Sequence, residues 1–256
     1  MSEVSFSTSD YVDGILKLLT LSFPHEKKYS KKYIDWPYLR NPYGVTLRAN
    51  LTEGENVNAT YAVFPMKYNF EGQLIDAALS LNTATHPNSR GQSWFPKLAN
   101  HVYDSAAAQG IKIILGVANK NSIGGFRKHL GFDVLGNVSL RLARPRSHLK
   151  ALNALRACRP ASSDYLKWRL ANSSIKYSKL VYGTDSLLVA TRSIPFVIGA
   201  STEGKVSLPV NRLLQVSPVC PCYYIFSNRA YGIEVPQKLM PSPWHLIIKN
   251  LGLAAC

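Results

Sequence analysis

Segment 86–98 combines residue types that could bind phosphate oxygens. Its centre, Arg90-Gly91-Gln92-Ser93, follows a mostly apolar stretch and precedes a helical pattern. A loop between a strand and a helix presents unpaired backbone N–H groups at the positive end of the helix, and these bind a pyrophosphate. Arg90 adds a fork of donors, Gly91 permits close approach of the backbone, and Ser93 offers a hydroxyl. Arg-Gly in this place is also found in ordinary surface turns.

The elements around this loop predict a β-α-β unit. Residues 75–85 form a long, mostly apolar run, as in a strand. From Phe95 to Ala106 apolar residues recur at helical spacing, with Pro96 in a first-turn position where a missing N–H costs nothing. Residues 111–117 are almost continuously apolar, which is typical of a strand buried on both faces. The pattern indicates an α/β fold with a mixed sheet.

The residues before this unit predict further strands and helices. A short strand at 4–6 precedes a helix that begins near Ser7-Thr8-Ser9-Asp10 and carries an apolar face from Tyr11 to Ser22. The aromatic and basic stretch 27–44 contains Pro and Gly, which indicates irregular structure after a short helix. Strands are expected at 45–52, 57–64 and 66–70.

Taken together, segment 86–98, Asn119-Lys120-Asn121-Ser122, and Phe126 with Leu130-Gly131-Phe132 resemble the GNAT family of acetyl-CoA-dependent N-acetyltransferases. The resemblance covers roughly residues 3–140. It implies a splayed central sheet flanked by helices, acetyl-CoA as the cofactor with CoA as product, and no metal. It also implies a set of cofactor-binding residues: Thr85, Arg90, Gly91, Gln92, Ser93, Trp94, Phe95, Asn119, Ser122 and Phe126.

Three residues depart from the family pattern. Ser93 stands where the family usually has the first loop glycine, and Phe95 stands at the second small position, where a branch with a similar loop end also has bulky residues. Phe126 stands where many relatives have a tyrosine that protonates the leaving thiolate. A thiolate leaves tolerably near neutral pH, so catalysis does not require that acid.

The resemblance implies an acyltransferase that needs donors to polarise a carbonyl and a base to take a proton from the amine. The donors are expected at the backbone of Thr83 to Thr85. His86 is the first candidate base, since an imidazole titrates near neutral pH, although a histidine before proline often bonds a turn instead. Asp76 and Asp35 are weaker candidates, and water alone could serve an amine whose pKa is lowered by positive surroundings.

The acceptor must suit a protein with 30 Lys and Arg against 15 Asp and Glu, a net charge of +15. Such charge fits a phosphate-bearing partner. The best match is the amine of a dTDP- or UDP-linked amino sugar used in surface-polysaccharide synthesis, as for several relatives. Tyr38, Arg40, Asn41 and Tyr43 lie where relatives wrap the acceptor.

Three alternatives to a nucleotide-linked amino sugar as the partner of this basic chain stay open. The enzyme could act on another small amine or a peptide. The chain could instead be a basic nucleic-acid-binding protein without catalysis, although its basic residues are scattered and no nucleic-acid motif occurs. A membrane surface could contact Leu149, Leu152 and Leu155, in addition to catalysis.

The length of 256 residues admits two domains. We predict a GNAT-like domain at 1–145, a basic connector at 146–160 with a helical piece from Ser147 to Cys158, and a second α/β domain at 161–256. The second domain could be a degenerate GNAT-like repeat. Tyr33-Ile34-Asp35-Trp36 recurs as Tyr165-Leu166-Lys167-Trp168, and Lys128 to Phe132 recurs as Lys249 to Leu253.

Cysteine usage and hydropathy complete these expectations. The four cysteines lack the spacing of a zinc site, so free thiols in a reducing compartment are expected. No run approaches the ~18 apolar residues of a membrane span, and the first residues lack the pattern of a secretory signal. We therefore expect a cytoplasmic protein. The oligomeric state is open.

Overall fold

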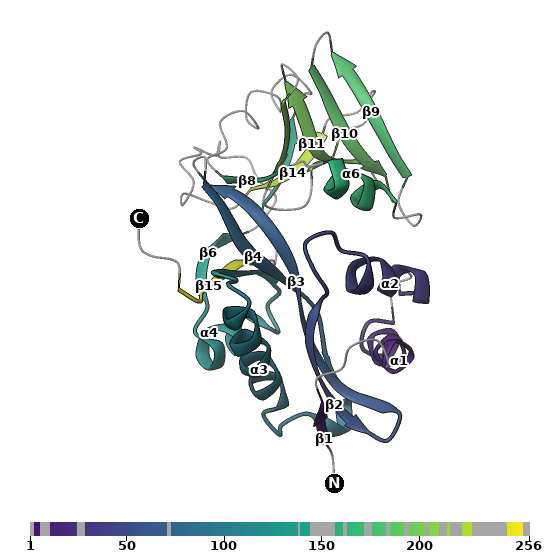
Figure 1. Ribbon diagram of the computed structural model, residues 1–256, viewed down its shortest axis with the longest axis vertical. Helices are drawn as coiled ribbons and strands as arrows, with labels where there is room; N and C mark the ends of the chain where they lie inside the picture. The colour runs from purple at the N-terminus through teal and green to yellow at the C-terminus, as the bar shows by residue number, and fades with distance from the viewer. Residues whose placement is uncertain are drawn as a thin grey trace.

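A mixed sheet with helices on both faces forms the first half of the protein, as the computed structural model shows (Figure 1). Helices α3 and α4 cover one face, and α1 and α2 cover the other. The structure describes residues 3–5, 11–24, 29–70, 73–137, 139–143, 157–160, 163–171, 176–182, 185–191, 195–202, 205–209, 214–215, 222–226 and 245–252.

The first half begins with β1 and two helices, continues through three antiparallel strands, and then alternates helices and strands. Its helices are α1 (Val12–Ser22), α2 (Lys31–Leu39), the 3₁₀ helix η1 (Pro87–Ser89), α3 (Trp94–Ala108) and α4 (Ile123–Leu130). Its strands are β1 (Glu3–Ser5), β2 (Leu47–Glu53), β3 (Asn56–Phe70), β4 (Gln73–Thr85), β5 (Ile113–Ala118), β6 (Asp133–Asn137) and β7 (Ser139–Ala143).

The predicted β-α-β unit is confirmed. Strands β4 and β5 run parallel, with Ala77 opposite Ile113 and Ser80 opposite Gly116. The predicted apolar face of α3 is buried: Leu98, Ala99, Val102, Tyr103 and Ala106. The mixed α/β fold expected from the sequence is therefore present.

Strand β3 lies at the centre of two hydrophobic clusters. Successive side chains of a strand point to opposite faces. Tyr61 and Val63 pack with α3, while Ala62 and Phe64 pack with α1 and α2. This strand is one continuous element where the sequence predicted two, at 57–64 and 66–70.

Helix α2 extends further than the sequence suggested. The Ser30 side chain accepts a hydrogen bond from the backbone N–H of Tyr33 at 3.2 Å, which caps the first turn. The helix continues through Pro37 to Leu39, so this part of the predicted irregular stretch is helical. The predicted cap of α1 at residues 7–10 lies outside the described residues.

The second half consists mainly of antiparallel strands and one described helix, α6 (Ser163–Leu170). Its strands are β8 (Ala157–Pro160), β9 (Lys176–Tyr182), β10 (Asp185–Thr191), β11 (Pro195–Thr202), β12 (Lys205–Pro209), β13 (Leu214–Gln215), β14 (Cys222–Phe226) and β15 (His245–Asn250). Through β8, which pairs with the end of β3 and with β12, the first sheet continues into the second half.

The two halves exchange strands. Strand β15, from the end of the chain, lies between β5 and β6 and pairs antiparallel with both. Strand β7, from the first half, pairs with β14 in a three-stranded sheet. The predicted first domain, 1–145, therefore lacks one strand of its own sheet.

Two sequence predictions about the second half need correction. The sequence repeat matches Lys128–Phe132 with Lys249–Leu253. The first segment lies at the end of helix α4 and the second at the end of strand β15, so the two are not structural equivalents. The helical piece predicted up to Cys158 ends in strand β8. The rest of that piece, with Leu149, Leu152 and Leu155, lies outside the described residues.

The other repeated pair, Trp36 and Trp168, makes a reciprocal contact. The indole rings stack with centroids 4.5 Å apart and an interplanar angle of 14°. Trp36 Nε1 donates to the carbonyl oxygen of Trp168 at 2.6 Å, and Trp168 Nε1 donates to that of Trp36 at 2.9 Å. Reciprocal contacts of this kind arise at two-fold-related interfaces. A duplicated second half would produce this arrangement; the duplication stays a prediction.

Two negative findings concern the described part of the chain. It contains no helix long and apolar enough to cross a membrane. In the same residues, no three His, Cys, Asp or Glu side chains come together as metal ligands would.

Candidate functional site

Strand β4 bends away from β5 at a β-bulge. Between β3 and β4 the register shifts: Leu81 lies opposite Ala62, and Ala84 lies opposite Thr60. Two residues of β4 thus oppose one of β3, and Asn82 has a left-handed backbone with φ of 57°. The pairing of β4 with β5 reaches only to Ser80 and Gly116, although β4 continues to Thr85. The end of β4 is therefore separated from its parallel neighbour.

The loop after β4 has the backbone form of an anion-binding turn. Gly91 has φ of 78° and Ser93 has φ of 57°, both left-handed. Ser93 is the residue before the first turn of α3, so the N–H groups of that turn point out of the helix. Alternation of left-handed and ordinary residues makes a concave array of N–H groups that binds anions.

A cavity of about 320 Å³ lies at this loop. It is lined by Thr85, Ser89, Arg90, Gly91, Ser93, Trp94, Phe95, Pro96 and His129. Of the predicted cofactor-binding residues, Thr85, Arg90, Gly91, Ser93, Trp94 and Phe95 thus come together around one cavity. Sequence reasoning missed His129, which is three residues after Phe126 on the same side of α4.

Side chains of the loop hold its shape. Arg90 Nε donates to the carbonyl oxygen of Thr85 at 3.3 Å, which ties the loop to the end of β4 and leaves the two terminal nitrogens of the guanidinium for a ligand. Gln92 accepts from Trp94 Nε1 at 3.1 Å and donates to Asn88. Gln92 does not line the cavity, so its side chain has a structural role within the loop.

Phe95, one of the residues that line the cavity, packs in a cluster of aromatic rings. Phe95 packs edge-to-face on Phe126 with centroids 5.1 Å apart, and Phe126 packs on Phe132 at 5.0 Å. A Cβ at Gly125 would lie 3.0 Å from the Phe95 ring, so the absence of a side chain there makes room for Phe95. Phe126 is buried and does not line the cavity; its predicted contact with the pantetheine arm stays a prediction.

Asn119 and Ser122 shape the turn between β5 and α4. Asn119 Oδ1 accepts from the backbone N–H groups of Asn121 at 2.9 Å and of Ser122 at 3.0 Å. Ser122 Oγ accepts from the backbone N–H of Asn119 at 3.1 Å. These bonds fix the start of α4. The Asn119 Nδ2 amide is the donor that the side chain retains for a ligand.

His86 makes the turn contact that was the alternative to catalysis. Its Nδ1 accepts from the backbone N–H of Asn88 at 3.3 Å, and the backbone N–H of His86 donates to the carbonyl oxygen of Asn58 at 2.7 Å. A neutral imidazole that accepts at Nδ1 carries its proton on Nε2. Thr83 is the second of the two bulge residues of β4, on the part of the strand that does not pair with β5, and its expected role as a donor stays a prediction.

The other candidate bases lie elsewhere. Asp76 pairs with Lys67 at 2.7 Å on the paired part of β4, before the bulge. Asp35 lines a separate pocket beside α2.

The predicted acceptor residues do not share one site. Asn41 is buried and bonds backbone, donating to the carbonyl oxygen of Pro65 at 2.8 Å. Tyr43 stacks on Tyr165 of α6 with centroids 5.5 Å apart. Tyr38 is fully buried against Phe64. Arg40 is exposed and lines a pocket.

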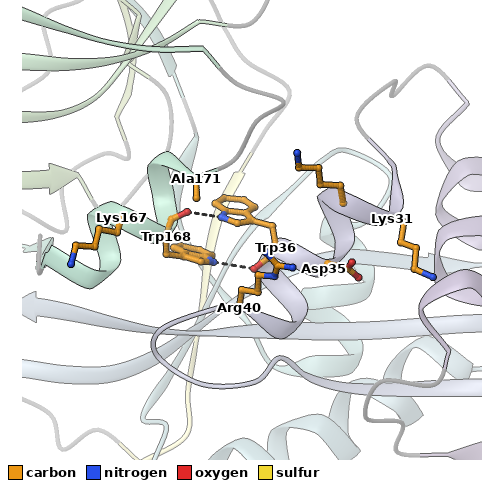
Figure 2. A pocket seen from close by; sticks show the side chains of 8 residues that line it. Lys31, Asp35, Trp36, Arg40, Lys167, Trp168 and Ala171 are labelled. Carbon is orange, nitrogen blue, oxygen red and sulfur yellow. Dashed lines mark hydrogen bonds between the residues drawn. The ribbon is translucent and has the colours of Figure 1, made fainter.

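The Arg40 pocket lies between α2 and α6 and has a volume of about 730 Å³ (Figure 2). We call it the α2–α6 pocket. Its lining consists of four cationic residues, one carboxylate, two stacked indoles and an alanine: Lys31, Lys32, Arg40, Lys167, Asp35, Trp36, Trp168 and Ala171.

Three buried tyrosines have raised pKa values. Burial raises the pKa of Tyr38 to about 12, opposed by a hydrogen bond from Asn82, whose Nδ2 lies 3.5 Å from the phenol oxygen. Burial also raises the pKa of Tyr61 and of Tyr103, whose hydroxyls share a hydrogen bond of 2.6 Å. These phenols stay protonated at neutral pH and serve the core.

Residues 3–135 match the family model described as "Acetyltransferase (GNAT) domain". None of the curated proteins matches the chain in sequence.

Solved structures share the fold at low sequence identity. A GCN5-related N-acetyltransferase from Kribbella flavida superposes with a TM-score of 0.61 and 12% identity, over 98% of this chain and 72% of that one. A probable N-acyltransferase of unknown function from Enterococcus faecalis V583 superposes with a TM-score of 0.58 and 10% identity, over 98% of this chain and 73% of that one. The N-myristoyltransferase of Saccharomyces cerevisiae, solved with bound myristoyl-CoA, superposes with a TM-score of 0.53 and 10% identity. The match covers 79% of this chain and 67% of that one.

Proposed function

Since the chain belongs to the GNAT acetyltransferase family and is an acyltransferase, we propose that it transfers an acetyl group from acetyl-CoA to a primary amine, with the pyrophosphate of CoA held at the start of α3. The observation that carries this assignment is the cavity at the loop with left-handed Gly91 and Ser93, directly after the end of β4 that no longer pairs with β5.

The residues around the cavity fit the charge and size of the pyrophosphate of CoA. Backbone N–H groups at the start of α3 and the Arg90 guanidinium are donors for phosphate oxygens. Pro96 has no N–H, so residues 91–95 supply the main-chain donors. His129 also lines the cavity and is a further donor.

Acetyl-CoA supplies an activated thioester when it is bound. The chain's residues then have two tasks. The N–H groups of β4 from the second bulge residue onward, at Thr83 to Thr85, polarise the carbonyl. A base removes a proton from the amine as the new C–N bond forms and the C–S bond breaks, and the released thiolate takes up a proton from water, since Phe126 has none to give.

Water is the base that the geometry favours. His86 could accept a proton at Nδ1 only by giving up its bond from Asn88. The net charge of +15 lowers the pKa of a nearby amine and increases its neutral fraction. His86 is kept as the alternative base.

For the acceptor we propose a phosphate-bearing amine, with a dTDP- or UDP-linked amino sugar of surface-polysaccharide synthesis as the first choice. The support is the surplus of positive charge beyond what CoA needs, part of which surrounds Arg40. A cationic peptide or polyamine would be repelled by the same residues.

The test is thiol release from acetyl-CoA across a panel of amines that includes dTDP- and UDP-linked amino sugars. We expect release that depends on the amine, and an Arg90→Ala enzyme whose CoA affinity falls about tenfold or more. Arg40→Ala is the matched control, because it removes the same side chain elsewhere. Equal CoA affinity in both variants would contradict the assignment. The same assay with His86→Asn distinguishes the two roles of His86. Asparagine can still accept the hydrogen bond from the backbone N–H of Asn88 in the turn, but it cannot act as a base.

A further inference from the structure

The α2–α6 pocket has the composition of an anion site. Four cations face one carboxylate around a volume of about 730 Å³, which is typical of pockets for small molecules. Figure 2 shows Arg40 beside the stacked indoles, with Lys167 on one side of them and Lys31 on the other. The lining comes from both halves of the chain.

Two of the lysines stand where they do not stabilise their helix. Lys31 and Lys32 are the first residues of α2, after the Ser30 cap, and no acidic residue lies in that turn. The N-terminal end of a helix is its positive end, where cations are unfavourable. An anion bound there would interact favourably with both ammonium groups and with the helix end.

The carboxylates nearby do not neutralise these cations. Lys31 lies 3.6 Å from Asp13, and Lys167 lies 3.9 Å from Asp164, with all four side chains largely exposed. Exposed pairs of this kind contribute little and yield readily to a phosphate. Within the described residues, Lys32 and Arg40 form no ion pair.

The indole pair gives the pocket an aromatic wall, and a buried cation lies close to one of the two rings. Both Nε1 atoms are used in the reciprocal bonds, so the wall presents aromatic surface and no neutral donors. The Arg169 guanidinium lies 5.6 Å from the Trp36 ring, is 7% exposed, and has a buried Nη1 without a hydrogen-bond partner among the described residues. Its charge adds to the positive potential.

Helix α2 also connects this pocket with the transfer site. Tyr38 is buried between α2 and the sheet and contacts Asn82, the residue at the bulge of β4. Trp36 on the same helix and Arg40 at its C-terminal cap line the pocket. One helix therefore contacts both the pocket and the strand that leaves β5.

We propose that the α2–α6 pocket binds the phosphate groups of the acceptor, and that a nucleoside diphosphate is the ligand class it takes. Lys32 and Arg40 are the principal phosphate contacts, and the exposed edge of Trp168 borders the nucleoside. This assignment rests on the proposed function, in which the acceptor carries phosphate.

The test is calorimetric titration with UDP, dTDP and inorganic pyrophosphate in the absence of acetyl-CoA. The variant is Lys32→Gln with Arg40→Gln, both exposed. The matched control is Lys17→Gln with Lys112→Gln, which removes the same charge at exposed positions outside both pockets. Arg90→Ala reports binding at the α3 loop, and CoA is titrated into every variant.

We expect UDP to bind the wild type and the control equally, and to bind K32Q/R40Q about tenfold or more weakly. CoA affinity should be unchanged in K32Q/R40Q. The proposal is overturned if no nucleotide or pyrophosphate binds, if K32Q/R40Q and the control bind equally, or if R90A alone weakens UDP binding. Failure of the acetyl-transfer assignment would appear separately, as a lack of CoA binding.

Discussion

Gly91 and Ser93 give the α3 loop the left-handed backbone on which its N–H array depends. Glycine adopts that conformation without strain, and the space around a Cβ at Gly91 is open. Ser93 adopts it at a cost of about 1 kcal/mol, because its Cβ crowds the following carbonyl. The loop therefore stores strain at Ser93, the position at which the family pattern has a glycine.

Ser93→Gly should relieve that strain. We expect the free energy of unfolding to rise by about 1 kcal/mol, because glycine has no Cβ penalty and the side chain makes no cap hydrogen bond. Denaturant unfolding measures the change. CoA affinity should be retained, since the main-chain donors stay in place. A destabilised variant would show that Ser93 makes a contact that outweighs its strain.

Tyr38 should make stability depend on alkaline pH. Its pKa is raised from 10 to about 12 by burial, so the folded state prefers the neutral phenol. This contribution is complete below pH 10 and is lost as pH rises toward 12. Tyr38→Phe should lose less stability between neutral pH and a pH of about 11 than the wild type does. Identical pH profiles of the free energy of unfolding would show that Tyr38 does not titrate in this way.

At the scale of elements, the bulge in β4 separates the two parallel strands. Asn82 tolerates the left-handed backbone that the bulge requires, as asparagine does more readily than most residues. The pairing of β4 with β5 ends two residues before it, at Ser80. The proposed site for the acyl group therefore depends on one backbone conformation.

Asn82→Val should close or distort that site, because a β-branched residue strongly disfavours positive φ. We expect acetyl transfer to fall about 100-fold through misplacement of the carbonyl donors. Asn82→Gly keeps the backbone conformation and should retain most of the activity. Similar losses of kcat/KM in both variants would assign the effect to the Asn82 side chain, which contacts Tyr38.

The elements with strong local patterns could be predicted from the sequence. Helix α3 follows from its apolar period, and β5 follows from its continuous apolar run. The bulge has no such signal, since Leu81-Asn82-Thr83 reads as ordinary strand. Tyr38 and Asn41 were expected at the acceptor site, but their burial depends on which face of α2 meets β3 and β4, and a local pattern does not specify that.

At the scale of the molecule, the end of the chain completes the first sheet. Ile247 of β15 is fully buried, and its side chain lies 3.2 Å from the position a Cβ would take on Gly116, the last residue of β5 paired with β4. Lys249 Nζ donates to the carbonyl oxygen of Leu130 at 2.6 Å, at the end of α4. No local pattern could reveal this, because more than a hundred residues separate β15 from β6.

Ile247→Ala should therefore destabilise the part of the molecule that carries the α3 loop. We expect a loss of about 3 kcal/mol in the free energy of unfolding, from lost burial and the cavity left behind. Val134→Ala, at an exposed position on the neighbouring strand β6, is the matched control and should change little. Equal effects of the two substitutions would contradict the placement of β15.

The most direct measurement of the central claim is a crystal structure of the protein with CoA. The account predicts both phosphates of the pyrophosphate within about 3 Å of main-chain nitrogens of residues 91–95, with Arg90 beside them. A pyrophosphate bound elsewhere, including in the α2–α6 pocket, with the α3 loop free of ligand, would contradict it.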